Sequence, residues 1–270
     1  MLERQSAPNA CDAAGSRDLM LGGQSGFHFS PKMLYGDARS PFSWNPSMLD
    51  FAAARRMMVD GQVRTSDVTD LRIIAAMLEI PRERFVPGTN TALAYLDLDV
   101  PAQQATGREE VRRLLKPMVL AKMVQAAAVK ETDQVLDVGC ATGYSSALLA
   151  RLAQSVVALE EDPALAQAAG ANLKSVGASN VTVVTGPLTA GWQAKAPYDV
   201  IFVNGAIEVV PHALCAQLKE GGRLLAVSGR APNGRAMVYR SVAGDVSGWP
   251  IFDAAAPLLP GFAKPPAFVF

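Results

Sequence analysis

The stretch best suited to chemistry is a short glycine-containing loop, LDVGCATGY at 136–144. It follows an apolar run, and Gly139 and Gly143 lack the Cβ atoms that would keep a ligand away from the backbone. The helix expected after the loop offers free N–H groups in its first turn. The loop is therefore a candidate ligand site, and a purely structural tight turn is the alternative.

Two carboxylates narrow the chemistry of that ligand. Glu160 ends the next apolar run, a position from which a carboxylate accepts hydrogen bonds from ribose hydroxyls. Asp137 precedes the loop, where its charge would repel a pyrophosphate, and Ala141 stands where the GxGxxG pattern has its middle glycine. Because a ligand with an ammonium and a sulfonium suits Asp137 better, we expect S-adenosylmethionine rather than a dinucleotide.

The expected contacts with this cofactor come from the loop and from the end of the following strand. They are Asp137, Gly139, Cys140, Ala141, Thr142, Gly143, Glu160 and Glu161.

The elements that must position these residues follow from the hydrophobic pattern. Strands are expected at 134–138, 156–160, 181–184, 199–203 and 223–227, with helices over 144–153, 163–175 and 211–218. Strands that are apolar on both faces, with helices between them, indicate a parallel sheet covered on both sides. Two further strands, 236–240 and 265–270, are expected to form an antiparallel edge. The predicted fold class is α/β: a Rossmann-like, doubly wound, mostly parallel sheet with an N-terminal helical extension.

The chain is expected to have three regions. Residues 1–47 are rich in Gly, Ser, Pro and Asn without periodicity, which predicts a disordered tail and suggests Met48 as the physiological start. Residues 48–130 are predicted to form a helical region with a substrate-side loop, and 131–270 the cofactor-binding domain.

Within the helical region, two helices have clear boundaries in the sequence. One is expected to begin at Thr69 or Asp70 and to stop at Pro81. The other is expected to run from Pro117, a good residue for a first turn, to about Val129.

The composition excludes several classes of protein. Lys and Arg (25) balance Asp and Glu (25), so no net charge attracts nucleic acid or an anionic membrane. The three cysteines are far apart, which argues against a disulfide framework and a zinc site. Since no apolar run approaches the roughly 20 residues of a membrane span and no signal peptide is recognised, we expect a cytoplasmic protein.

Several segments resemble one protein family, in order and at similar spacing. They are MVDGQVRT (58–65), IPRERFVP (80–87), AYLD (94–97), LDVGCATGY (136–144), APYDVIFVNGA (196–206), VP with the following LCAQLKEGGRLLAVSG (210–229), and the terminal FVF. From about Met48 to Phe270 the chain resembles protein-L-isoaspartate O-methyltransferases. The resemblance implies transfer of a methyl group from S-adenosylmethionine to the free carboxylate of isoaspartyl residues in damaged proteins and peptides.

The resemblance also implies roles for individual residues. Tyr95 and Asp97, in AYLD, are expected on the substrate side, and Gly186 with Pro187 near the adenine, although the family has an Asp where Pro187 stands. Leu115 occupies the position of the family serine that contacts the substrate carboxylate, and leucine donates no hydrogen bond.

The implied reaction needs neither a general base nor a nucleophile from the protein. A carboxylate is already ionised at neutral pH, and direct methyl transfer forms no covalent enzyme intermediate, so Cys140 is interpreted as a packing residue. Because of Leu115 and Pro187, two alternatives stay open. The first is a family member that has lost repair activity and acts as an S-adenosylmethionine-binding or regulatory protein. The second is a methyltransferase for another substrate.

Overall fold

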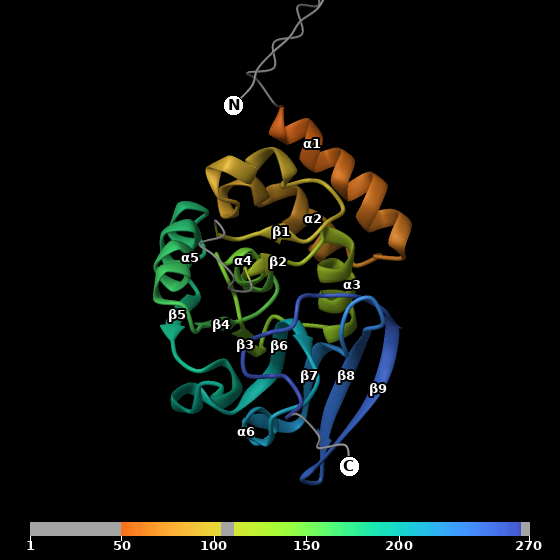
Figure 1. The fold of residues 1–270 in the computed structure, drawn as a ribbon, viewed down its shortest axis with the longest axis vertical. Helices are drawn as coiled ribbons and strands as arrows, with labels where there is room; N and C mark the ends of the chain where they lie inside the picture. The colour runs from red at the N-terminus through yellow and green to blue at the C-terminus, as the bar shows by residue number, and fades with distance from the viewer. Residues whose placement is uncertain (1–49, 104–110, 266–270) are drawn as a thin grey trace, which may run out of the picture. The chain divides into compact units, whose positions relative to one another are not determined.

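The computed structural model describes residues 50–103 and 111–265. A seven-stranded sheet lies at its centre, in the order β5-β4-β3-β6-β7-β8-β9 (Figure 1). The strands are β3 (Gln134–Val138), β4 (Ser155–Glu160), β5 (Val181–Thr185), β6 (Tyr198–Ile207), β7 (Leu218–Ser228), β8 (Arg235–Val242) and β9 (Asp245–Asp253). β3 to β7 pair in parallel, and β8 and β9 add an antiparallel edge. The predicted α/β fold, mostly parallel with an antiparallel edge, is confirmed.

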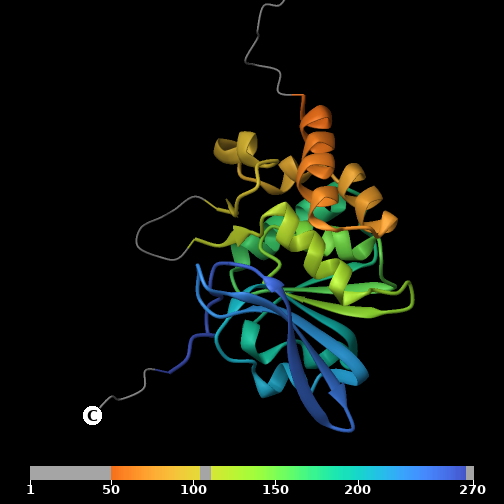
Figure 2. The same ribbon diagram turned by 90° about the vertical axis from the view of Figure 1, so that its right-hand side faces the viewer.

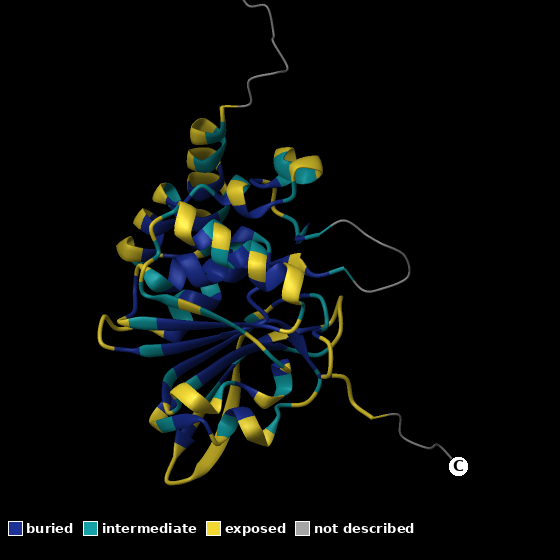
Figure 3. Cartoon of the chain, turned by 90° about the vertical axis from the view of Figure 1, so that its left-hand side faces the viewer, coloured by how far each residue is buried: buried dark blue, intermediate teal, exposed yellow. Residues whose placement is uncertain are grey.

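At β3, β4 and β6 both faces of the sheet are buried, which explains why these strands are mostly apolar. In β4, Val156 and Ala158 belong to one hydrophobic cluster, whereas Val157 and Leu159 belong to another on the opposite face. Successive side chains of a strand point to opposite faces, so a run without polar residues serves both clusters. Figure 3 shows these buried strands between two layers.

Helices on one face of the sheet belong to the larger cluster. They are α3 (Pro117–Ala127), α4 (Tyr144–Ala150) and α5 (Pro163–Ser175). The other face is covered by α6 (His212–Cys215) and by the C-terminal residues Leu259 and Phe262. Figure 2 shows helices on both sides of the sheet. α5 begins where predicted, because Oδ1 of Asp162 accepts from the Ala164 N–H at 2.8 Å.

The N-terminal helices pack against the same cluster as α3 to α5. α1 (Phe51–Met58) continues into a π-helical turn, and α2 (Leu71–Glu79) begins after Asp70, whose carboxylate accepts from the Arg72 N–H at 2.9 Å. A two-residue ladder of β1 (Val100–Pro101) and β2 (Arg113–Leu114) follows, and the chain then enters α3.

Three features differ from the sequence-based prediction. β9 was not expected; it is mostly exposed and carries Gly248 and Pro250, so it lacks a strand-like apolar run. The helix predicted over 211–218 is confined to α6, because Leu218 already pairs with Tyr198 as the first residue of β7. α3 ends at Ala127 because Ala128 has a φ of +47°.

Some predictions lie outside the described residues. They are the tail at 1–47 and all but the first residue of the strand at 265–270. The boundary proposed near residue 130 stays a prediction. In 50–103 and 111–265, no helix combines the length and the apolar character needed to cross a bilayer.

Candidate functional site

The glycine loop lies at the carboxyl end of β3, beside the end of β4. The backbone N–H groups of Gly139 and Cys140 both donate to the carbonyl oxygen of Leu159, at 2.8 and 3.2 Å. Gly139 and Gly143 have φ values of +75° and +96°, and Gly143 is the last residue before α4. These angles favour glycine, so the loop conformation explains both residues.

Asp137 is fully buried at the start of this loop. Its Oδ2 accepts from the hydroxyls of Ser145 and Ser146, each at 2.6 Å, and Asn204 in turn donates to Ser145 at 2.9 Å. Its Oδ1 has no hydrogen-bond partner in the described part of the chain. Burial raises the pKa of Asp137 to about 6, although the two serine hydroxyls act in the opposite direction. The carboxylate thus has one oxygen free for a donor on a ligand.

Glu160, at the end of β4, is also buried, with 1% of its side chain exposed. Its Oε2 accepts from the N–H of Ala141 at 2.7 Å, and its Oε1 from the N–H groups of Glu161 and Asp162 at 2.9 and 3.4 Å. The structure therefore brings Glu160 into direct contact with the glycine loop, as the predicted site requires.

Arg112 reaches into this site from the segment before α3. Its Nη2 donates to the carbonyl oxygen of Gly139 at 2.9 Å and to Oε2 of Glu160 at 3.2 Å, and 9% of its side chain is exposed. A Cβ atom on Gly139 would lie 2.6 Å from that nitrogen. The space left by the missing side chain of Gly139 is thus occupied by a guanidinium group.

Leu259 lies over the same loop from the C-terminal segment. Cβ atoms on Gly139 and Gly205 would lie 3.4 and 2.6 Å from its methyl groups. The segment is fixed to the end of β6, because the Ala206 N–H donates to Pro257 O and the Leu259 N–H donates to Ala206 O. Leu259 therefore forms an apolar wall of the site.

The middle residues of the loop connect it to other parts of the chain. The Thr142 hydroxyl donates to the carbonyl oxygen of Phe85 at 2.6 Å, and Asn172 donates to the carbonyl oxygen of Thr142 at 3.1 Å. Ala141 has a φ of +51°, unusual for a residue with a Cβ atom. Burial raises the pKa of Cys140 well above its ordinary value, which favours packing over nucleophilic chemistry.

The residues expected near the adenine and ribose follow β4 and β5. Glu161 is exposed beside Glu160. The Gly186 N–H donates to Glu160 O at 3.1 Å, and a Cβ atom on Gly186 would lie 3.5 Å from the ring of Trp192. Pro187 is exposed. Their roles toward a ligand stay predictions.

The expected substrate residues lie in the N-terminal region. The Tyr95 hydroxyl donates to Glu83 and accepts from Nε of Arg55 at 2.9 Å, so this side chain is held in an ion-paired cluster. Asp97 is exposed. Leu115 is 1% exposed, and its carbonyl oxygen accepts from Nη2 of Arg82 at 2.8 Å. Their roles toward the substrate likewise stay predictions.

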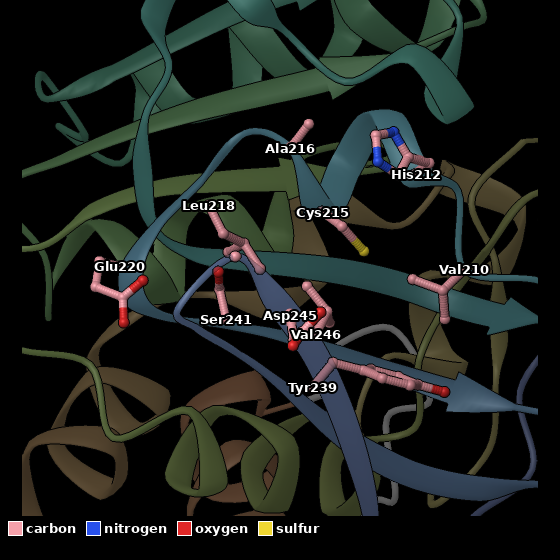
Figure 4. Close-up of a pocket in the computed structure, with 11 residues that line it drawn as sticks. Val210, His212, Cys215, Ala216, Leu218, Glu220, Tyr239, Ser241, Asp245 and Val246 are labelled. Carbon is pink, nitrogen blue, oxygen red and sulfur yellow. The ribbon is translucent and has the colours of Figure 1, made fainter.

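A hollow of about 700 Å³ lies away from the glycine loop (Figure 4). It is lined by residues of α6, β7, β8 and β9, among them Cys215 and Tyr239, and it includes no residue of the glycine loop. The two buried carboxylates suited to binding a nucleoside, Asp137 and Glu160, lie at the glycine loop and not at this hollow. We therefore regard the loop as the functional site.

Sequence reasoning did not identify several side chains of this site. Ser145, Ser146 and Asn204 form the network around Asp137, and Leu259 covers the loop. The sequence around Arg112 gives no sign that its guanidinium reaches the glycine loop. Ser145 and Ser146 lie in the first turn of the helix that follows the glycine loop. Their position close to Asp137 in the sequence is the signal from which this contact could have been predicted.

Comparison with known proteins identifies the family of the chain. A family model described as Protein-L-isoaspartate(D-aspartate) O-methyltransferase (PCMT) matches residues 54–246. The chain belongs to this family. It is 37% identical over 202 residues to the protein-L-isoaspartate O-methyltransferase of Koribacter versatilis, covering 74% of this chain and 87% of that protein. It is 40% identical over 178 residues to that of Methanoregula boonei, covering 66% and 79%.

Solved structures of related proteins have the same fold as this isoaspartate methyltransferase family member. A protein-L-isoaspartate O-methyltransferase superposes with a TM-score of 0.69 at 26% identity, covering 77% of this chain and 66% of that one. A beta-aspartate methyltransferase (PCMT) from Plasmodium falciparum, in complex with S-adenosyl-L-homocysteine, gives a TM-score of 0.63 at 16% identity. It covers 76% of this chain and 97% of that one.

Proposed function

We propose that this family member transfers the methyl group of S-adenosylmethionine to the carboxylate of isoaspartyl residues in proteins and peptides. The observation that supports this most is the placement of Glu160 at the end of β4, where its Oε2 accepts from the N–H of Ala141. A buried carboxylate at the carboxyl edge of a parallel sheet, joined to a glycine loop, is the arrangement that binds the ribose of a nucleoside.

The residues of the site fit an S-adenosyl ligand. The carboxylate of Glu160 would accept from ribose hydroxyls, and Oδ1 of Asp137 is a buried acceptor without a partner in the described residues. When bound, S-adenosylmethionine supplies an electrophilic methyl group on a sulfonium.

The protein's own contribution is binding and orientation. The substrate carboxylate is ionised at neutral pH, so a C–O bond forms to the methyl carbon as the S–C bond breaks, and no proton has to move. The products are a methyl ester and S-adenosylhomocysteine. Alignment of the two reactants and exclusion of water account for the rate, and Leu259 beside Gly139 would contribute to that exclusion.

A second candidate function is a family member that binds the nucleoside without repairing proteins. Leu115 favours it, because the residue expected to hold the substrate carboxylate is a buried leucine. Loss of one oriented donor lowers turnover by about 100- to 1000-fold.

The test is transfer of labelled methyl from S-adenosylmethionine to a peptide with one isoaspartyl residue, with its aspartyl twin as control. Wild type, Leu115→Ser and Leu115→Ala are compared, since both substitutions remove the same packing and only serine adds a hydroxyl. Selective transfer by the wild type supports the proposed activity. Transfer by Leu115→Ser alone supports the second function, and no transfer by any of the three contradicts isoaspartyl methylation.

The proposed compartment is the cytoplasm. The three cysteines lie far apart in the sequence, which is typical of proteins from a reducing environment.

A further inference from the structure

The Arg112 guanidinium bridges two acceptors of the candidate cofactor site. One nitrogen, Nη2, donates both to Gly139 O and to Oε2 of Glu160. These oxygens belong to the loop and to the strand end that the proposed function assigns to the nucleoside. The ion pair is almost fully buried, with 9% of the arginine and 1% of the glutamate side chain exposed.

The other hydrogen bonds of Glu160 indicate that a ligand would compete with Arg112 for its Oε2 atom. Oε1 accepts from two backbone N–H groups, of Glu161 and Asp162, and Oε2 accepts from one, of Ala141, besides Arg112. Backbone groups of the loop are held by the fold, whereas an arginine side chain can rotate. A ribose hydroxyl that approaches Oε2 therefore meets the Arg112 guanidinium first.

The space beside Gly139 leads to the same conclusion. A Cβ atom there would lie 2.6 Å from Nη2 of Arg112, so the guanidinium fills the volume that a glycine leaves for a ligand. A nucleoside and this guanidinium cannot both occupy it.

We propose that Arg112 is an internal competitor of the nucleoside, and that an S-adenosyl ligand binds Glu160 only after the guanidinium has left it. This inference rests on the proposed function, because it concerns the same site, and it adds a residue that sets the affinity of that site.

The surroundings of Arg112 allow such a movement. Its Nε is buried without a hydrogen-bond partner in the described residues, so the guanidinium leaves one of its donors unsatisfied in this position. The side chain also lines a hollow of about 270 Å³ together with Arg113, Pro257 and Leu258. We infer that the guanidinium turns toward that hollow when it leaves Glu160.

The experiment is calorimetric titration of S-adenosylhomocysteine into the wild type, Arg112→Met and Arg113→Met. Methionine keeps approximately the unbranched apolar stem of arginine but removes the charge and the donors. Arg113 is the matched control, because it is adjacent and exposed, and its Nη1 donates to Asp99 O instead of to Glu160. We expect Arg112→Met to bind S-adenosylhomocysteine at least about tenfold more tightly than the wild type does, because one charged hydrogen bond no longer has to be broken. Arg113→Met should bind like the wild type.

A measurement on the wild type covers the case in which Arg112→Met does not fold. The Nε–H signal of Arg112 is followed by NMR during the same titration, with Arg223, which pairs with Asp133 before the start of β3, as internal reference. We expect the Arg112 signal to shift and to exchange faster with solvent, and the Arg223 signal to stay unchanged.

The outcomes separate the two proposals. Binding by the wild type with equal or weaker affinity for Arg112→Met, or with an unmoved Arg112 signal, overturns the competitor role and leaves the proposed function standing. Binding by Arg112→Met alone supports the competitor role strongly. No binding by either protein overturns both.

Discussion

The Ser145 hydroxyl donates a hydrogen bond to Oδ2 of Asp137 at 2.6 Å, in a position from which solvent is excluded. Ser146 donates to the same oxygen, so a buried carboxylate depends on two hydroxyls, and among the residues that the structure describes no cation is in hydrogen-bond contact with it. Its ionisation in the folded protein is therefore costly, and burial raises its pKa from 3.8 to about 6.

The raised pKa predicts how Asp137→Asn changes stability with pH. The folded state holds the proton more tightly than the unfolded state, so this carboxyl contributes stability below pH 4 that is lost as the pH rises to about 6. Between pH 4 and pH 7, the stability of Asp137→Asn relative to the wild type should rise by at most about 3 kcal/mol. Urea unfolding at several pH values measures this, and a pH-independent difference would contradict the raised pKa.

Substitution of Leu115 should affect stability independently of its effect on catalysis. The side chain is 1% exposed within the main cluster, and loss of a buried leucine side chain costs about 2–5 kcal/mol. Leu115→Ala and Leu115→Ser should therefore both lower the free energy of unfolding by about this amount, as measured in urea. A loss below about 1 kcal/mol would mean that the site collapses around the smaller residue. Methyl transfer assays of these variants belong at a temperature where both remain folded.

Gly139→Ala and Gly177→Ala separate backbone strain from the contact with Arg112. Both glycines have similar φ values, +75° and +69°, but a Cβ atom on Gly177 meets nothing within 4 Å. Gly177→Ala should cost about 1–2 kcal/mol, from strain alone. Gly139→Ala should cost about 1–3 kcal/mol more, because its Cβ displaces the Arg112 guanidinium. Equal losses in thermal unfolding would show that Arg112 moves aside freely.

Arg82 offers a test of how the N-terminal region is held. Its guanidinium is fully buried over the Tyr144 ring, 4.6 Å from the ring centroid, and donates to Ala94 O and Leu115 O, each at 2.8 Å. Lysine cannot make this two-point contact. Arg82→Lys should lower the unfolding free energy by about 1.5–3 kcal/mol in urea, whereas Arg84→Lys, at an exposed position, should change it by about 0.5 kcal/mol or less. Similar losses in both would contradict the role of the buried contacts.

The parallel strands were predictable because burial on both faces makes a strand apolar at every residue, as at Val156–Leu159. β9 was not, since most of its side chains are exposed and it contains glycine and proline. The glycine loop and Glu160 could be located because each directly follows its own strand. Arg112 could not be placed in this way, since it reaches Glu160 only through the β1–β2 pairing and the start of α3, which bring together residues 48 positions apart.

The hydrogen bond from the Thr142 hydroxyl to Phe85 O joins the glycine loop to the 3₁₀ turn at Arg82–Phe85. Opening of that turn must break a contact that belongs to the loop, so occupancy of the loop and opening of the turn are thermodynamically linked. A ligand that binds the loop more tightly when the turn is closed must therefore make opening of the turn rarer, by the ratio of its affinities for the closed and open states. Amide hydrogen exchange near Phe85 therefore reports on the filling of a site that Phe85 meets through its carbonyl oxygen and through the ring of Tyr144.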